Sequence, residues 1–174
     1  MMVALTGTPG TGKTTIARIL ERKYHVVYLK DYEEARREYD RRRDTYTVDM
    51  EYLAEKVREL RKYAGKIIIE GHYSHEFSVD IVIVLRCHPD ELMKRLEKRN
   101  YKKEKIMENV EAEAMSLITS EAINRHGRDK VYEIDTTKET PETVAEEVEE
   151  IVEGKNLEKY VPRINYSEVI LGWY

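Results

Sequence analysis

The eight residues from Gly7 to Thr14 restrict the possible folds of this chain more than any other segment. They read Gly-Thr-Pro-Gly-Thr-Gly-Lys-Thr, which matches the pattern G-x-x-x-x-G-K-[ST] at every fixed position. An apolar run at residues 2–6 precedes them, and residues 13–23 place apolar side chains on one helical face. This order predicts a buried strand, a glycine loop and a helix. The alternative, a glycine-rich turn with a surface lysine, accounts for the pattern but not for its flanks.

A loop of this kind is suited to binding phosphate groups. Its glycines allow backbone N–H groups to turn inward onto phosphate oxygens, and the positive end of the following helix adds to the attraction. Lys13 would bridge the outer phosphates, the Thr14 hydroxyl would ligate Mg²⁺, and Thr15 would support the α-phosphate.

Unbroken apolar runs elsewhere predict further strands that are buried on both faces of a parallel sheet. These runs lie at residues 25–29, 66–70, 79–85 and 130–134. Segments with helical spacing separate them, and two of these begin at Pro89 and Pro141. The alternation predicts an α/β fold, with a mainly parallel five-stranded sheet covered by helices on both faces.

Three other segments are expected to be helical. Residues 31–43 are highly charged, and residues 106–118 place apolar side chains in register along a single longer helix. Apolar residues spaced from 53 to 64 predict a helix that ends at Gly65.

Length and composition fit one cytoplasmic domain. The 174 residues are 41% hydrophobic, which is enough to bury one core. The longest apolar run is only as long as a strand, so we expect neither a membrane span nor a signal peptide. Cys87 is the single cysteine, which excludes an internal disulfide and a multi-cysteine zinc site and favours a reducing compartment. Glutamine is absent beside abundant Glu, Lys and Arg, which favours a thermophilic source.

Positive charge gathers in two places, although the net charge is −4. Five arginines lie within residues 36–43, and seven Lys or Arg residues within 94–105. The first group could bind an acceptor phosphate, and Arg99 could move onto a transferring phosphoryl group. Two other interpretations stay open. The clusters could be salt-bridged helix faces, since acidic residues are interleaved, or they could contact RNA phosphates, although no RNA-binding motif accompanies them.

Polar residues follow the strand at residues 67–70, at the edge where open parallel sheets bind ligands. Glu70 ends the strand, and His72 and His75 follow it. A carboxylate here can hold a Mg²⁺-bound water or act as a base, so Glu70 is a candidate for metal binding and catalysis, and His72 for catalysis. The alternatives are an ordinary strand-end acid for Glu70 and turn histidines, the structural reading being favoured for His75.

Four segments, in order along the chain, resemble one known family. They are residues 6–15, Glu70-Gly71-His72, Val84-Leu85-Arg86 and Leu96-Glu97-Lys98-Arg99-Asn100-Tyr101. Together they are similar to adenylate kinase isoenzyme 6, a nuclear-type adenylate kinase and ATPase of eukaryotes and archaea. The resemblance runs from the N-terminus to about residue 154. The loop alone indicates only a nucleotide-binding kinase or ATPase, whereas the acid-x-His and Arg-x-Tyr elements are more specific.

This resemblance implies the three-layer P-loop NTPase fold of nucleoside monophosphate kinases. It implies a single domain, with a monophosphate-binding segment at about 30–49, a short lid at about 98–108 and an unassigned tail at 155–174. The implied reaction is Mg²⁺-dependent transfer of a phosphoryl group from ATP to AMP, giving two ADP, with some ATPase activity. The implied partners are ATP, AMP and a small-subunit ribosomal protein, with transient contact to pre-ribosomal RNA during small-subunit maturation and rRNA processing.

The resemblance also implies residue roles. The residues implied to hold ATP are Gly10, Gly12, Lys13, Thr14 and Thr15. Arg99 would open the lid and contact ATP, and the loop around Lys138 would border the adenine. Glu70 and His72 take the acid-x-His positions, although some members have Asp where Glu70 stands. Asn100 replaces a glycine that is common in the lid turn.

Three hypotheses on function follow from the sequence. The first is an adenylate kinase, and the second is an ATPase switch in ribosome assembly whose kinase activity is incidental. The third is another small-molecule kinase with the same loop, such as one acting on a hydroxyl. The aromatic residues of the tail are expected to pack on the core rather than to bind a partner; they are Tyr160, Tyr166, Trp173 and Tyr174.

Overall fold

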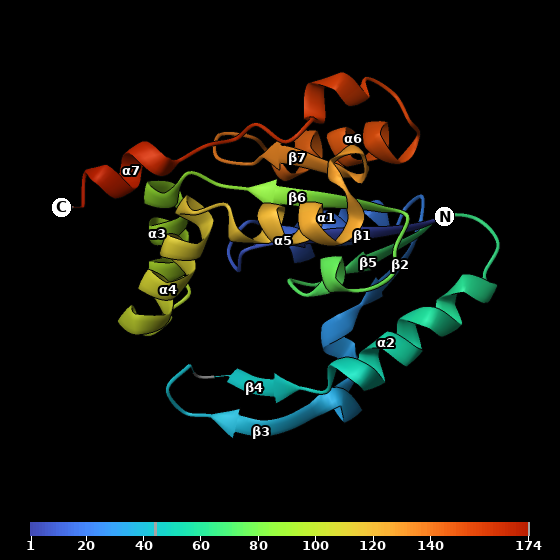
Figure 1. Cartoon of the computed structure of the whole chain (residues 1–174), viewed down its shortest axis with the longest axis horizontal. Coiled ribbons are helices and arrows are strands. Elements are labelled where there is room, and N and C mark those ends of the chain that lie inside the picture. The colour runs from blue at the N-terminus through green and yellow to red at the C-terminus, as the bar shows by residue number, and fades with distance from the viewer. Residues whose placement is uncertain (44, 174) are drawn as a thin grey trace.

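Strands and helices alternate along the chain in the computed structural model, which describes residues 1–43 and 45–173 (Figure 1). The strands are β1 (Met2–Gly7), β2 (His25–Tyr28), β3 (Arg36–Asp40), β4 (Thr45–Val48), β5 (Ile67–Glu70), β6 (Ile81–Arg86) and β7 (Val131–Asp135). The helices are α1 (Lys13–Leu20), α2 (Met50–Glu59), α3 (Pro89–Lys98), α4 (Lys103–Ala114), α5 (Leu117–His126), α6 (Pro141–Val152) and α7 (Ser167–Leu171).

The main sheet has five strands in the order β2-β5-β1-β6-β7, and every neighbouring pair is parallel. The strand β1 lies at the centre, where Val3 pairs with Ile68 of β5 and Ile81 of β6. Because both neighbours of β1 run in the same direction, the carboxyl ends of the strands meet at one edge. The predicted α/β fold is confirmed.

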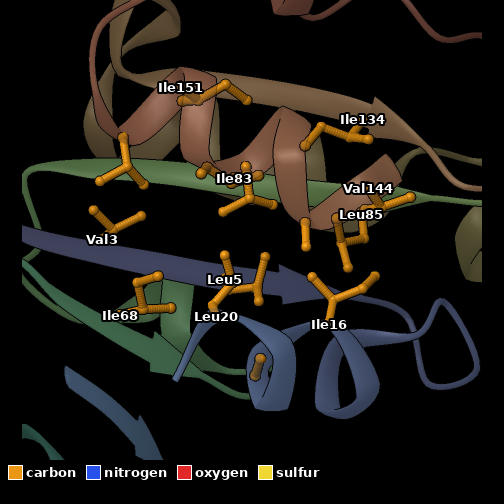
Figure 2. Close-up of a cluster of buried hydrophobic side chains, with 14 of the residues drawn as sticks. Val3, Leu5, Ile16, Leu20, Ile68, Ile83, Leu85, Ile134, Val144 and Ile151 are labelled. Carbon is orange, nitrogen blue, oxygen red and sulfur yellow. The ribbon is translucent and has the colours of Figure 1, made fainter. Parts of the chain in front are cut away.

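Helices cover both faces of this sheet, which explains why its strands are continuously apolar. Val3 and Leu5 point to the face covered by α1 and α6, where Leu5 lies opposite Leu20 (Figure 2). Met2 and Ala4 point to the other face, covered by α2 and α5. A smaller core around Leu92 joins α3 to α4. The result is three layers, with α3 and α4 packed together beside them (Figure 1).

The expectation that residues 31–43 are helical is wrong. Two short 3₁₀ turns there lead into β3, which pairs with β4 in a separate antiparallel hairpin. The Tyr39 and Tyr46 rings meet across the two strands at 5.2 Å between centroids. Asp40 accepts hydrogen bonds from the backbone N–H groups of Arg42 and Arg43, which turns the chain out of β3. The segment lacks the apolar stripe of a packed helix, so turn chemistry and cross-strand contacts decide its structure.

The single helix expected at residues 106–118 is in fact two helices. Ser116 adopts a left-handed conformation with φ 54°, between the end of α4 and the start of α5. Arg86 reaches this break from β6, and its Nη2 donates to the Glu113 carbonyl at 3.1 Å and to the Ser116 hydroxyl at 3.0 Å. A residue from a distant strand thus satisfies the helix end, and no local periodicity reports such a contact.

The other helix boundaries agree with the predicted signals. Pro89 and Pro141 stand at the starts of α3 and α6. The helix predicted near residue 53 is α2, which a short 3₁₀ turn extends towards Gly65 at φ 96°. Within the described residues, every helix is too short or too polar to cross a lipid bilayer.

The tail after α6 packs on the rest of the protein, as expected for its aromatic residues. Tyr160 is buried against the α1 and α6 side of the sheet, and Trp173 packs on the core between α3 and α4. The Tyr166 ring meets that of His88 edge-on at 5.3 Å between centroids. Figure 1 shows the tail passing β7 and ending beside α3. Tyr174 lies outside the described residues.

Candidate active site

A cavity of about 590 Å³ lies where β1 and β5 end. The phosphate loop and Glu70 form its floor, the β3–β4 hairpin forms one wall, and Arg99 and α4 form another. The hairpin and α4 also meet directly, because Arg43 pairs with Glu108 at 3.7 Å and Lys102 donates to the Arg41 carbonyl at 3.3 Å. Segments far apart in the sequence therefore enclose one space.

The phosphate loop needs glycine where it passes beneath α3. Gly10 and Gly12 have φ values of 96° and 99°, in the region that side chains disfavour. A Cβ atom on Gly10 would also lie 2.8 Å from a methyl group of Leu92 and 2.9 Å from one of Leu96. Gly12 is the N-cap of α1. The loop thus keeps its backbone open at the cavity, next to the positive end of a helix.

Lys13 is buried at the centre of this loop, and its Nζ donates to the carbonyls of Gly7 at 2.7 Å and Thr8 at 3.2 Å. Burial lowers the pKa of Lys13 to about 8, although the nearby Glu70 carboxylate acts in the opposite direction. The ammonium is therefore held close to the point of losing its proton. A phosphate group beside it would restore the charge.

Glu70 and Thr14 bring two oxygen atoms together at the end of β5. The Thr14 hydroxyl lies 3.4 Å from the Glu70 carboxylate, and Lys30 Nζ lies 3.4 Å from the same hydroxyl. Burial raises the pKa of Glu70, and the charges of Lys13 and Lys30 oppose that rise. Oxygen donors are what Mg²⁺ prefers. The chemistry of this pair fits the predicted magnesium site.

His72 lines the cavity with its ring against that of Tyr73, at 3.7 Å between centroids. Burial, and then the charge of Lys13, lower the pKa of His72 to about 3. The imidazole is therefore neutral near pH 7 and is a weak base. It can orient a water molecule through a ring nitrogen better than it can remove a proton.

His75 has the structural role that the sequence favours. Its buried ring lies between the Thr6 hydroxyl, 3.0 Å from Nδ1, and the Glu121 carboxylate, 2.8 Å from Nε2. Possible metal-ligating atoms of His75, Glu76 and Glu121 lie within 4.8 Å of one another. Glu121 already occupies the ring nitrogen that a metal would need, so the contact ties α5 to the end of β1.

Arg99 lies at the C-terminal end of α3, exposed at the cavity. Its charge helps to lower the pKa of Lys13, so the two cations face the same space. Asn100 follows with φ 57°, a conformation that asparagine tolerates better than most residues, so it can replace a glycine in this turn. The Arg95 guanidinium instead binds the loop after β7, where it donates to the Thr136 carbonyl at 2.9 Å.

Two residues that are predicted to contact ATP are not among the described residues that line the cavity. Thr15 is exposed on α1, and Lys138 is exposed on the loop after β7. That loop is tied to the phosphate loop through Arg95, which reaches Thr136 and the Gly10 carbonyl. The roles of Thr15 and Lys138 in ATP binding stay predictions.

The arginines of residues 36–43 divide into two groups. Arg36 and Arg43 line the cavity, whereas Arg37 pairs with Asp49 at 2.5 Å. Two tyrosines that join them there, Tyr46 and Tyr73, were missed by sequence reasoning, whereas Tyr101 and Lys105 belong to the lid predicted at about 98–108. The alternating residues 45–48, Thr-Tyr-Thr-Val, are a strand signal that could have revealed the hairpin.

Comparison with known proteins agrees with this geometry. A family described as "AAA domain" matches residues 3–116. A protein of Methanosarcina acetivorans is 42% identical, over 93% of this chain and 95% of its own length. One of Pyrococcus abyssi is 41% identical, over 97% of this chain and 93% of its own length. Both carry the name "Putative adenylate kinase".

Solved structures share the fold at low sequence identity. A deoxyadenosine kinase from M. mycoides has a TM-score of 0.55 and 18% identity, covering 88% of this chain and 99% of its own. A shikimate kinase from Bacteroides thetaiotaomicron has a TM-score of 0.55 and 20% identity, covering 88% and 98%. With its complete phosphate-loop pattern, this chain belongs to the family described as "AAA domain" and to the archaeal relatives named "Putative adenylate kinase".

Proposed function

We propose that this protein is a nucleotide kinase of the adenylate kinase type, which transfers a phosphoryl group from ATP to AMP. One observation carries the proposal: the phosphate loop and the basic hairpin line the same cavity, with Lys13 on one side and Arg36 and Arg43 on the other. An acceptor that is itself a phosphate needs a second anion site facing the first. The names of the relatives and the resemblance to adenylate kinase isoenzyme 6 support the same acceptor.

On the donor side, the backbone of the phosphate loop would hold the ATP phosphates at the start of α1. Lys13 would exchange its loop carbonyls for the outer phosphate oxygens, which would keep it protonated. Thr14 and Glu70 would hold Mg²⁺. When bound, the ion would neutralise phosphate oxygens and orient them for transfer.

On the acceptor side, the nucleophile is already charged. A phosphate monoester loses its second proton near about pH 6, so the AMP phosphate needs no general base. Arg36 and Arg43 would hold this phosphate, and Arg99 would neutralise the group in transit. Water as acceptor is different because it must be oriented and deprotonated. Glu70 and His72 would share that task, which AMP phosphorylation does not require, while Glu70 would hold Mg²⁺ in both reactions.

The test is a reaction of the purified chain with Mg²⁺-ATP, with and without AMP, in which ADP and free phosphate are followed separately. We expect ADP to form fast only with AMP, with little free phosphate. Phosphate release that ignores AMP would contradict the proposal and would identify an ATPase. Poor activity with AMP, together with phosphorylation of a hydroxyl compound, would instead support the third hypothesis, another small-molecule kinase with the same loop.

A role in small ribosomal subunit maturation is a further part of the proposal, and it rests on the family resemblance alone. In that role the chain would bind a small-subunit ribosomal protein, and ATP hydrolysis would change when the partner is present. The measurement is the rate of phosphate release with and without purified small subunits. An unchanged rate together with no co-sedimentation would remove this part and leave the kinase proposal intact.

A further inference from the structure

Three charged side chains are buried together behind the phosphate loop. Arg86, Glu113 and Glu133 are 1%, 2% and 4% exposed. Arg86 Nε donates to Glu113 at 3.0 Å, and its Nη1 donates to Glu133. Burial alone would lower the pKa of Arg86, but the two carboxylates reverse this and raise it. Buried charges are costly unless each is paired, so this cluster needs all its partners.

Glu113 connects the cluster to the phosphate loop. One oxygen of its carboxylate accepts from Arg86 and from the Cys87 backbone N–H at 2.8 Å. The other accepts from the Thr8 hydroxyl at 2.9 Å. Thr8 occupies a position that the loop pattern leaves open, so the pattern itself gives no reason for this contact.

The backbone carbonyl of Thr8 also accepts several of the hydrogen bonds that shape the turn of the loop. Its carbonyl accepts from Lys13 Nζ at 3.2 Å, from the Thr11 backbone N–H at 3.2 Å and from the Thr11 hydroxyl at 2.8 Å. A carboxylate that holds the Thr8 side chain therefore holds the carbonyl on which Lys13 rests. The loop is anchored from behind, on the side away from the cavity.

The tail completes the cluster at its other end. Glu133 accepts hydrogen bonds from the backbone N–H groups of Arg163 at 2.7 Å and Ile164 at 2.9 Å. Arg86 donates to the Ile164 carbonyl at 3.3 Å. Two carboxylates share one guanidinium, so these backbone groups help to balance the second negative charge. Hydrogen bonds thus run from the tail through Glu133, Arg86 and Glu113 to Thr8.

We propose that Glu113 is a positioning residue for the phosphate loop, and that the tail segment at Arg163 and Ile164 keeps Glu113 in place. The inference rests on the proposed binding of ATP at this loop. Without the Thr8 contact, the loop must be ordered by the nucleotide itself, which weakens binding. The kinetic signature is a raised KM for ATP with a nearly unchanged kcat, because the contact is present before and during transfer.

The loop end of this chain of contacts is tested with a matched pair of variants in the full chain. Thr8→Val removes the hydroxyl at nearly constant volume, and Thr8→Ser restores it. We expect Thr8→Val to raise the dissociation constant of Mg²⁺-ATP and the KM for ATP about tenfold, the usual effect of losing a hydrogen bond to a charged group. Thr8→Ser should recover most of this loss. Equal ATP binding by Thr8→Val and wild type would overturn the role of Glu113.

The tail end is tested with a second pair, also in the full chain. Ile164→Pro removes the N–H that donates to Glu133, and Ile164→Ala keeps it. We expect Ile164→Pro to weaken ATP binding about threefold or more, and Ile164→Ala to leave it within about twofold of wild type. Identical affinities in the two variants would contradict the role of the tail. If Ile164→Pro does not fold, Arg163→Pro takes its place, because it removes the other N–H that donates to Glu133, at 2.7 Å. ATP affinity equal to that of wild type would then contradict the role of the tail.

Binding is measured directly with a fluorescent ATP analogue and Mg²⁺, apart from any phosphoryl transfer. This separates the two proposals. Wild-type protein that binds ATP but fails to phosphorylate AMP would refute the adenylate kinase function, while the Thr8 pair would still test the anchor. Wild-type protein that transfers phosphate normally, with Thr8→Val equal to wild type, would refute only the anchor.

Discussion

Lys13 is buried, and burial weakens its hold on the proton that gives it a positive charge. Burial lowers its pKa to about 8, so it begins to lose its proton in a pH range where an exposed lysine stays charged. ATP phosphates would favour the protonated form and raise that pKa again. We therefore expect ATP to bind most tightly below about pH 8 and more weakly as the pH rises through the pKa of Lys13 in the free protein.

This gives a prediction for ATP affinity. Between about pH 7 and pH 9, the dissociation constant of Mg²⁺-ATP should rise about tenfold, because only a tenth of Lys13 stays protonated at the upper end. The measurement is a fluorescence titration at several pH values and constant ionic strength. Lys13→Arg is the control, since arginine stays charged throughout. It should bind ATP less well and show no such dependence, and a flat wild-type curve would contradict the assignment.

A second prediction for a single residue concerns the role of His72 in ATP hydrolysis. We expect His72→Ala to lower ATP hydrolysis about tenfold or more and AMP phosphorylation less than threefold, since only water needs to be oriented. A pKa of about 3 also predicts that protonation of His72 causes no inflection near pH 6.5 in the hydrolysis rate. Both rates are followed in one preparation. Equal losses in the two reactions would refute this division of labour.

Among the structural elements, the β3–β4 hairpin decides which basic residues face the cavity. Arg36 lies over the Tyr46 ring, 5.5 Å from its centroid, and lines the cavity. Arg42 follows β3 on the same hairpin but is not part of the cavity lining as described. The strand alternation and the turn at Asp40 thus separate arginines that are close in sequence.

The prediction is a difference between two substitutions on one hairpin. Arg36→Ala should raise the KM for AMP about tenfold and leave the KM for ATP within about twofold, because a charged contact to the acceptor phosphate is lost. Arg42→Ala should change neither value by more than about twofold. Steady-state kinetics with AMP and ATP varied in turn provide the test. A shared effect on both KM values would argue that the hairpin supports the cavity without binding the acceptor.

Surface groups connect the hairpin to the segment that is predicted to form the lid. Arg43 and Glu108 are 64% and 56% exposed, and pairs of this kind contribute little in water. The cavity can therefore open by breaking weak contacts, which substrate entry and product release require. The phosphate loop differs, since it is anchored from behind by buried groups.

In the whole molecule, the tail after α6 connects the main sheet at β7 with the core between α3 and α4. Its backbone binds Glu133 of β7, and Trp173 covers the core formed by Leu92 and Leu96. The tail therefore contributes to the stability of the core domain.

Deletion of residues 163–174 should accordingly lower the melting temperature. Loss of the Glu133 contacts and of the Trp173 packing predicts a decrease of about 5–10 °C in a thermal unfolding scan. Leu171→Ala is the control, because this side chain is 77% exposed and should leave the melting temperature unchanged. An unchanged melting curve for the deletion would favour a role of the tail in binding a partner.

Features that depend on neighbouring residues could be predicted from the sequence. The isoleucines at residues 67–69 predict a strand buried on both faces, and the glycines and lysine of residues 7–14 predict the phosphate loop. Pro89 and Pro141 mark helix starts because their fixed φ suits that position. These signals are local, since backbone preference and side-chain alternation act over a few residues.

Contacts between distant residues could not be predicted in this way, because they depend on how the whole chain folds. Arg86 ends α4 from another strand, so the apolar register of residues 106–118 does not report the break. Arg36 and Arg43 face the cavity because the hairpin lines it together with the phosphate loop, whereas Arg95 donates to the loop after β7. Thr8 gains its carboxylate partner from a helix more than a hundred residues away. Contacts of this kind form when buried charges find partners across the fold, and sequence spacing carries no record of that requirement.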